Sequence, residues 1–226
     1  MILTFDFGEP SDEDVEAIGS LWGTVYFVKH VKPAANGVPL VDLTGNALGP
    51  KLSRKDWCLA GIEGTLALKA ADGSTVVYNY AGKKGASQTD CSGFSSLSPD
   101  KVAALERTRW RRAKGPYGDG AGSRVLVPYR TIAVDREVIK LGTAIYVPDA
   151  RGIKIKLPGG NSAVHDGYFL AGDVGGAIKG RHIDFFIGTT EKNPFPFATA
   201  SSKVRFKALR VKRQEIVNEL AKLHKA

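Results

Sequence analysis

Three aspartates stand within or beside short apolar segments in the C-terminal half of the sequence. Asp135 follows Thr-Ile-Ala-Val, Asp173 follows Leu-Ala-Gly, and Asp184 lies between Ile183 and Phe185. A carboxylate among apolar residues costs free energy unless it is hydrogen-bonded or its pKa is raised so that it holds a proton. This placement marks a candidate site, and a carboxyl group with a raised pKa is a residue type that can serve as a general acid or base.

Glycines occupy the segment between two of these aspartates. Gly175, Gly176 and Gly180 let the backbone turn sharply and approach a ligand closely. Asp173 and Asp184, 11 residues apart, can therefore face one another from the end of one strand and the start of the next.

Structural roles compete with catalysis at these positions. An aspartate at a strand end is more often a turn cap than a catalyst, and we favour that role for Asp135. Asp184 alternates with Ile183 and Phe185, and this pattern leaves open whether its side chain faces solvent or the interior of a barrel.

The elements that would position these residues are mostly strands. Short segments rich in β-branched and aromatic residues, bounded by Gly, Pro, Asp or Asn, predict strands. These segments are Trp22–Val28, Ile62–Lys69, Thr75–Tyr80, Val125–Val134, Thr143–Val147, Gly167–Ala171, Ile183–Ile187 and Val204–Val211. Helical periodicity predicts helices over Ser98–Arg109 and Arg213–Lys225, of which the second is amphipathic. Many short strands and few helices favour a barrel.

Composition narrows the classes of function. The 226 residues are 43% hydrophobic and 24% charged, without an apolar run long enough to span a membrane, which describes a globular domain with room for an insertion. The net charge of +9 favours an anionic partner such as nucleic acid, anionic lipid or peptidoglycan. No RNA-binding, zinc-finger or helix-turn-helix pattern accompanies this charge, so specific nucleic-acid recognition is disfavoured.

The first 20 residues do not resemble a secretory signal. They hold six acidic and no basic residues, and they lack the basic and apolar segments of such a signal. If the protein acts outside the cytoplasm, we expect that a signal was removed or that export follows another route.

The cysteines and histidines disfavour a metal site. Cys58 and Cys91 allow one disulfide, but we favour two unpaired thiols because a single fold of this length does not need the bridge. His165 and His182 lack a third ligand at metal-binding spacing, and we expect them to be exposed or to lie behind the site. We expect no metal and no organic cofactor.

The segments around the aspartates resemble a known family. AVDREVIKLGT and GDVGGAIKGRHIDFFIG are similar to the 3D (Asp-Asp-Asp) domain of the membrane-bound lytic murein transglycosylase A family. Upstream, Glu63-Gly64-Thr65 resembles that family's Gln-Gly-Ser segment, and YAGKKG, which begins at Tyr80, resembles its Tyr-Ala-Gly-Lys-Asn-Gly segment.

The resemblance implies a mainly β fold, namely a six-stranded double-psi β-barrel with an inserted β elaboration and a C-terminal amphipathic helix. An acidic segment of residues 1–19 would precede the barrel domain of residues 20–211, with the insertion at about 30–112 and the helix at 212–226. The chain is shorter than the larger enzymes of the family around residues 30–110, where they insert a second β domain.

The resemblance also implies an activity. The family cleaves the β-1,4 bond between N-acetylmuramic acid and N-acetylglucosamine in peptidoglycan and closes a 1,6-anhydro ring without water. Asp184 matches the catalytic position, as the acid that protonates the leaving oxygen and the base that then deprotonates the C6 hydroxyl. Asp173 would orient and tune Asp184, and Asp135 would give a supporting hydrogen bond. The partner would be the glycan strand, and the place of action the cell envelope, in the periplasm or outside the cell.

Strands and loops that match the family would also contact the glycan. The substrate-binding candidates are Thr24, Tyr26, Glu63, Thr65, Lys83, Gly175, Gly176 and Lys179. A lysine in a glycine-rich loop is more often merely solvated, and Glu63 would turn the reaction into hydrolysis if it held a water.

Two other functions fit the sequence. Asp90-Cys91-Ser92-Gly93 resembles the nucleophile segment of the NlpC/P60 cysteine peptidases, in which the cysteine opens a helix that lowers the thiol pKa, although the apolar helix does not follow directly here. Double-psi barrels of the expansin type bind carbohydrate without cleaving it and also keep an aspartate in their groove, which makes a non-catalytic cell-wall-binding module the other alternative.

Overall fold

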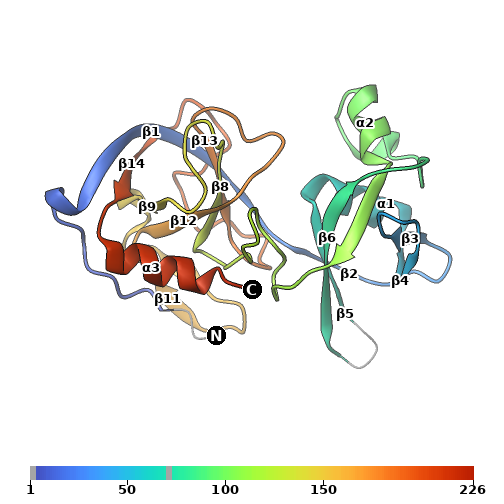
Figure 1. Cartoon of the computed structure of the whole chain (residues 1–226), viewed down its shortest axis with the longest axis horizontal. Helices are drawn as coiled ribbons and strands as arrows, with labels where there is room; N and C mark the ends of the chain where they lie inside the picture. The colour runs from blue at the N-terminus through green and yellow to red at the C-terminus, as the bar shows by residue number, and fades with distance from the viewer. Residues whose placement is uncertain (1–3, 70–72) are drawn as a thin grey trace. The chain divides into compact units, whose positions relative to one another are not determined.

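The structure is a computed structural model and describes residues 4–69 and 73–226. The chain folds into two compact units, whose elements are drawn in Figure 1. The first unit comprises the residues up to Phe27 together with Asp119–Ala226, and the second comprises Val28–Gly118. In sequence, the second unit is therefore inserted into the first.

The first unit is built around a closed barrel of six strands. In the order in which they pair, these are β1 (Val15–Tyr26), β13 (His182–Phe186), β8 (Thr131–Ala133), β12 (Tyr168–Asp173), β9 (Ala144–Tyr146) and β14 (Phe206–Val211). The pairs β1/β13 and β8/β12 are parallel, and the other four pairs are antiparallel. The hairpin of β10 (Lys154–Lys156) and β11 (Ser162–Val164) and the helix α3 (Gln214–Leu223) also belong to this unit. The expected mainly β fold with a barrel is confirmed.

Two expected boundaries in this unit need correction. Strand β1 begins at Val15, so the barrel includes part of the acidic segment 1–19 that was expected to precede it. The strand expected over Val125–Val134 is limited to β8, because a turn with Tyr129 at a φ of 60° occupies residues 127–131.

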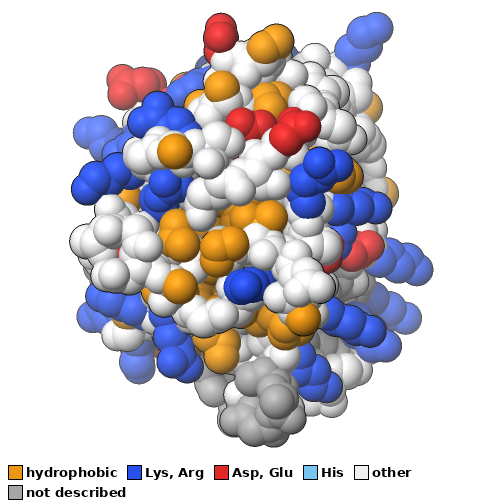
Figure 2. Space-filling model, turned by 90° about the vertical axis from the view of Figure 1, so that its right-hand side faces the viewer, with side chains coloured by type: hydrophobic (Ala, Val, Ile, Leu, Met, Phe, Trp, Pro, Cys, Tyr) orange, Lys and Arg blue, Asp and Glu red, His pale blue; other side chains and the backbone are white. Residues whose placement is uncertain are grey.

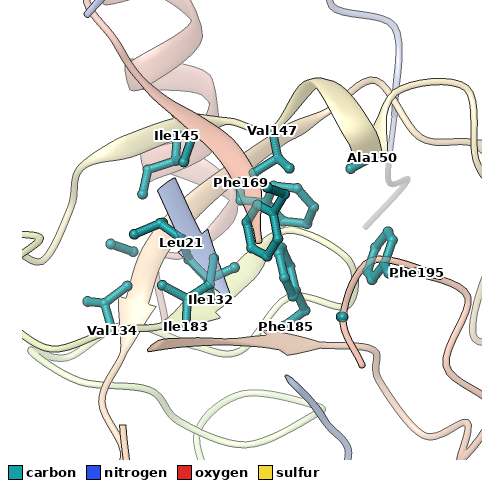
Figure 3. Packing of buried hydrophobic residues seen from close by; sticks show 14 of the residues in the cluster. Leu21, Ile132, Val134, Ile145, Val147, Ala150, Phe169, Ile183, Phe185 and Phe195 are labelled. Atoms are coloured by element: carbon teal, nitrogen blue, oxygen red, sulfur yellow. The ribbon is translucent and has the colours of Figure 1, made fainter. Parts of the chain in front are cut away.

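The barrel interior is packed with apolar side chains from alternate strand positions. Leu21, Ile132, Ile183 and Phe185 are among the fully buried residues of this cluster (Figure 3). Because successive residues of a strand point to opposite faces, their neighbours along the strands point away from the interior. Asp184, between Ile183 and Phe185, therefore lies on the outer face of the barrel.

Glycine at position 23 is required by this packing. A Cβ atom on Gly23 would stand 2.8 Å from the ring of Phe185 and 3.2 Å from the ring of Phe206. Glycine lets β1 lie directly against the aromatic core. This close approach sets how far the outward-facing side chains of β1 stand from the core.

A buried ion pair ties the N-terminal residues to the barrel. The Arg130 guanidinium donates from Nη1 and Nη2 to the Asp166 carboxylate, at 2.6 and 2.8 Å. Nη2 also donates to the Thr4 carbonyl, and the Phe5 ring lies 4.1 Å from the guanidinium carbon. The N-terminal segment is therefore packed onto the first unit.

The second unit has its own sheet and its own core. Its elements are the sheet of β2 (Lys29–Val31), β5 (Thr65–Lys69), β6 (Thr75–Lys83) and β7 (Thr108–Arg112), the hairpin of β3 (Val38–Val41) and β4 (Ala47–Leu52), and the helices α1 (Arg54–Glu63) and α2 (Pro99–Leu105). Trp57 and Trp110 are fully buried in the core and meet edge to face, with ring centroids 6.1 Å apart.

Helix α1 was not expected and shortens a predicted strand. The strand expected over Ile62–Lys69 begins only at Thr65, because Ser53 caps the start of α1 and Gly64, at a φ of 76°, ends it. The helix expected over Ser98–Arg109 likewise ends at Leu105 and is followed by β7.

The expectation of two unpaired thiols is wrong. Cys58 of α1 and Cys91 form a disulfide, with their Cα atoms 5.5 Å apart and both side chains buried. The expectation assumed one large fold, whereas the chain divides into two units with separate cores, and the smaller core gains more from a covalent link.

Candidate active site

Two of the three aspartates lie in one row across the barrel. Thr24 of β1 is in register with Asp184 of β13, Asp184 with Ala133 of β8, and Ala133 with Asp173 of β12. Paired residues of neighbouring strands point to the same face, and neighbouring strands are roughly 4.8 Å apart, so the two aspartates stand roughly 10 Å apart at the backbone. The small Ala133 side chain lies between them on the outer face.

A β-bulge puts Asp173 into this row. The register of β12 against β8 shifts between Ala171 and Asp173, so that Gly172 is the extra residue. Without the extra residue, Gly172 would be paired with Ala133 and Asp173 would point to the opposite face. A Cβ atom on Gly172 would stand 3.0 Å from Thr131, which makes glycine the fitting residue at the bulge.

Asp173 is held by two donors in a largely apolar setting. The Val174 amide donates to Oδ1 at 2.8 Å, and the Tyr26 hydroxyl donates to Oδ2 at 3.0 Å. Burial raises the pKa of Asp173 to about 6, and the two hydrogen bonds only partly oppose this shift. Burial and the negative charges of Asp173 and Asp184 raise the pKa of Tyr26 well above its usual value, so its hydroxyl remains a donor.

Asp184 is half-buried and hydrogen-bonded to Thr24, its register partner on β1. The Thr24 hydroxyl donates to Oδ1 of Asp184 at 2.7 Å. The negative charges of Asp173 and Asp184 both raise the pKa of Tyr26, so the two carboxyl groups lie around one tyrosine. Asp173, whose pKa is raised by burial, can hold a proton of the kind that acid–base catalysis uses.

Asp135 lies outside the row. Its carboxylate accepts hydrogen bonds from the amides of Gly180, at 2.8 Å, and Glu137, at 3.1 Å, and these bonds lower its pKa. Asp135 therefore fixes the glycine-rich loop between β12 and β13 to the segment that follows β8.

The expected substrate-binding residues fall into three groups. Thr24 and Tyr26 contact the two aspartates directly. Gly175, Gly176 and Lys179 line a hollow of about 350 Å³ beside Asp135. The residues that belong to the second unit are Glu63 at the end of α1, Thr65 at the start of β5 and Lys83 at the end of β6. Of these three, Thr65 is buried and accepts a hydrogen bond from Asn79 at 2.8 Å, while Glu63 and Lys83 are exposed.

Trp22 had no role assigned from the sequence, and His182 was expected to be exposed or to lie behind the site. The rings of Trp22 and His182 stack, with centroids 3.7 Å apart and planes inclined by 5°. His182 Nε2 lies 2.8 Å from the Thr24 hydroxyl oxygen. The alternation of Trp22, Thr24 and Tyr26 on one strand was a signal for this shared face.

His165 is neither exposed nor near the row. It is fully buried in the barrel core, where Nε2 lies 2.8 Å from the Tyr129 carbonyl and Nδ1 accepts from the Gly167 amide. Burial lowers its pKa to about 4, so it is a neutral structural histidine at neutral pH.

The hypothesis of a cysteine peptidase is wrong. Cys91 is fully buried in the disulfide with Cys58 and precedes only the three-residue 3₁₀ turn Ser92–Phe94. It therefore has neither a thiolate nor the long helix that would activate one.

The described residues give no sign of a metal centre or a membrane helix. Within 4–69 and 73–226, no group of three or more His, Cys, Asp and Glu side chains is arranged to hold a metal ion. Over the same residues, no helix is long and apolar enough to cross a membrane.

Comparison with known proteins addresses the resemblance seen in the sequence. Residues 130–203 match the family model of the 3D domain, and this segment contains all three aspartates. The resemblance to the 3D domain is confirmed. No curated protein matches the chain.

Solved structures of lytic transglycosylases have a similar fold. MltA of E. coli with bound chitohexaose is 18% identical with a TM-score of 0.53, and the match covers 85% of this chain and 71% of that one. The membrane-bound lytic murein transglycosylase of Agrobacterium tumefaciens is 17% identical with a TM-score of 0.53, over 90% and 76%. MltA of Neisseria gonorrhoeae is 15% identical with a TM-score of 0.50, over 85% and 72%. At these identities the similarity shows the fold, and it extends well beyond the segment that matches the 3D domain.

Proposed function

We propose that this protein is a peptidoglycan lytic transglycosylase that cleaves the β-1,4 bond between N-acetylmuramic acid and N-acetylglucosamine. The observation that carries the proposal is the row on the outer face of the barrel, in which Thr24 holds Asp184 and Tyr26 holds Asp173. The similarity of the fold to MltA, one structure of which contains chitohexaose, supports a glycan substrate. We further propose that the barrel is of the double-psi type, because its six strands include two parallel pairs.

In the proposed reaction Asp184 acts twice. Protonated Asp184 gives its proton to the glycosidic oxygen, and the bond from that oxygen to C1 of the muramoyl residue breaks. The carboxylate that remains takes the proton of the C6 hydroxyl of the same residue, and O6 bonds to C1. The proton count of Asp184 is restored, no water is consumed, and the product ends in a 1,6-anhydro ring.

Asp173 is the rival acid, because its pKa of about 6 lets it hold a proton near neutral pH. Its oxygens accept hydrogen bonds from the Val174 amide and the Tyr26 hydroxyl. We assign proton transfer to Asp184, because it stands where the resemblance places the family's catalytic residue, and the orientation and tuning of Asp184 to Asp173. Asp135 would support both by holding the loop between β12 and β13.

Charge favours a cell-wall substrate. Peptidoglycan carries carboxylates on its stem peptides, and the chain has a net charge of +9. The face shown in Figure 2 displays more Lys and Arg than Asp and Glu side chains. We propose that Lys179, Gly175 and Gly176 contribute to glycan binding, and that Thr24 and Tyr26 contact the sugar next to the aspartates. On the second unit we propose glycan contacts for the exposed Glu63 and Lys83, but not for Thr65, which is buried.

The disulfide fits action in the cell envelope. Disulfides form and persist in oxidising compartments, which include the bacterial periplasm and the cell exterior. The Cys58–Cys91 bridge therefore supports an extracytoplasmic location for this protein.

A digest of purified peptidoglycan tests the function. We expect anhydromuropeptides as the products. Products with reducing ends would instead indicate a hydrolase, and a sacculus that is bound but unchanged would indicate a carbohydrate-binding module of the expansin type.

A further inference from the structure

Four side chains on the outer face of β1 and β13 form a continuous series. Trp22 stacks on His182, whose Nε2 lies 2.8 Å from the Thr24 hydroxyl oxygen. The same hydroxyl oxygen lies 2.7 Å from Asp184 Oδ1. Trp22 and His182 are a register pair, as are Thr24 and Asp184, so both contacts are set by the pairing of the two strands.

The number of hydrogens on these side chains limits which of them can donate and which can accept a hydrogen bond. A threonine hydroxyl donates one hydrogen bond and accepts up to two. When Asp184 is ionised, Thr24 donates to it, so the contact with His182 requires a hydrogen on Nε2. When Asp184 is protonated, it can donate to Thr24, which then donates to an unprotonated Nε2.

The surroundings of His182 favour the second arrangement at rest. Burial lowers the pKa of His182, although a hydrogen bond with the Ala177 backbone partly opposes the shift. His182 as a whole residue is only 8% exposed. A neutral ring whose other nitrogen bonds to a backbone carbonyl presents Nε2 as an acceptor.

We propose that His182 is a positioning residue for Asp184, which acts through Thr24 to favour the protonated carboxyl group, and that Trp22 holds the imidazole in place by stacking. This rests on the proposed function, in which Asp184 must begin the reaction as an acid. When Asp184 turns its proton to the glycosidic oxygen and loses it, the Thr24 hydroxyl reverses its direction and donates to the carboxylate that remains.

Other titratable groups also face this part of the barrel. Tyr26 of β1 and Asp173 of β12 lie on the far side of Asp184 from His182, and Asp135 follows β8. Lys179 and Arg181 precede His182 in the chain and are exposed. Variants of His182 leave all of these groups in place, so a change in pH dependence can be assigned to the imidazole.

The first test does not depend on activity. Imidazole nitrogen NMR of the full chain gives the titration midpoint of His182 in the wild type, Thr24→Val and Asp184→Asn. We expect the midpoint to fall in both variants, because the protonated ring loses either its acceptor or the nearby negative charge. The exposed His30 of β2 should keep its midpoint. An unchanged midpoint of His182 in both variants would overturn the proposed link.

The second test measures catalysis. His182→Phe keeps a ring that can stack on Trp22 but removes Nε2, so we expect kcat for anhydromuropeptide release to fall about 10–100-fold with little change in KM. The alkaline limb of the pH profile should move to lower pH, because Thr24 is then free to donate to the ionised carboxylate. His182→Gln, whose amide can bond to Thr24, should recover part of the rate.

A matched control and the possible outcomes distinguish the role of His182 from the proposed function of the protein. His30→Phe, a substitution of the same type at an exposed position, should leave rate and pH profile unchanged. Release of anhydromuropeptides by His182→Phe at the wild-type rate and pH profile would overturn the role of His182 and leave the proposed function standing. A wild-type protein that releases none, yet shows the coupled titration, would overturn the function alone.

Discussion

Asp173 and Asp184 flank strand β8, and each is in register with the same residue, Ala133. This arrangement depends on the bulge at Gly172, which brings Asp173 to the outer face where Asp184 already lies. It also explains the small residue between them, since a longer side chain at Ala133 would occupy the space between the two carboxyl groups. The relationship leads to different expectations for the two aspartates.

The substitution Asp184→Asn should abolish glycan cleavage while folding and binding to sacculi remain. Asparagine nearly matches the carboxyl group in shape, but it can neither give nor take a proton, so the acid step and the ring-closing step fail together. The expected loss is about 10²–10⁴-fold in anhydromuropeptide release. Release near the wild-type rate would refute the assignment.

Asp173→Asn should have a milder effect on the rate. Loss of a nearby negative charge favours the ionised form of Asp184, so the activity optimum should move to lower pH.

Asp135→Asn should act mainly through stability, because Asp135 holds the loop at Gly180. The same assay across a pH series compares the three variants, and a fully inactive Asp173→Asn would move the role of acid to Asp173.

Many strands of the barrel could be predicted because each is a short segment of β-branched and aromatic residues bounded by turn residues. The alternation around Asp184, with Ile183 and Phe185 directed inward, indicated a strand but not which face was buried. Helix α1 was missed because its apolar residues mark no clear face: Trp57, Cys58 and Ala60 are buried, whereas Ile62 is exposed. The Ser53 cap and Gly64 were local signals for its two ends, but which side of the helix is buried depends on the core of the second unit.

The site was predictable in its residue types and not in its geometry. The apolar setting of Asp173 and Asp184 and the glycines between them marked the site in the sequence. The row they form depends on which strands pair and on the bulge at Gly172, and no local pattern encodes either. The sequence left open whether His182 is exposed or lies behind the site, because its partner, Thr24, is 158 residues away in the chain.

Tyr26→Phe should raise the pKa of Asp173 above its value of about 6. The Tyr26 hydroxyl donates to the ionised carboxylate and so lowers its pKa, and phenylalanine removes that bond while keeping the ring. Carboxyl carbon NMR across pH 4–8 measures the change. Tyr80→Phe, at an exposed tyrosine of the second unit, is the control and should leave Asp173 unchanged. A midpoint that falls or stays the same would contradict the prediction.

Stability should decrease as the pH falls from about 6.5 to about 4. Burial lowers the pKa of His165 and of His224 to about 4, so in this range the unfolded chain binds protons at both residues that the folded chain does not. Asp173, whose pKa is raised from 3.8 to about 6, acts in the opposite direction, because the folded state holds its proton in most of this range.

Two histidines lower the stability on acidification and one aspartate raises it, so we expect a net loss of stability. The melting temperature measured across the pH series tests whether stability falls. Asp173→Asn removes the opposing contribution and should make the decrease steeper. A melting temperature that is constant or rises on acidification from pH 6.5 to 4 would show that the two histidines are not buried in their neutral form.

Reduction of the Cys58–Cys91 disulfide should destabilise the second unit and spare the barrel. The bridge joins residues 33 positions apart, and closing a loop of that length in the unfolded chain stabilises a fold by about 3–4 kcal/mol in the chain-entropy model. Both cysteines lie in the core with Trp57, whereas the barrel has a separate core around Phe185. Hydrogen exchange by mass spectrometry, with and without reductant, should therefore show faster exchange in peptides from residues 28–118 and unchanged exchange in the barrel strands. The double variant Cys58→Ala/Cys91→Ala is the matched control, since it should exchange like the reduced protein and respond no further to reductant. Equal acceleration in both units would mean that they unfold together, and no acceleration in the second unit would mean that its own core is sufficient without the bridge.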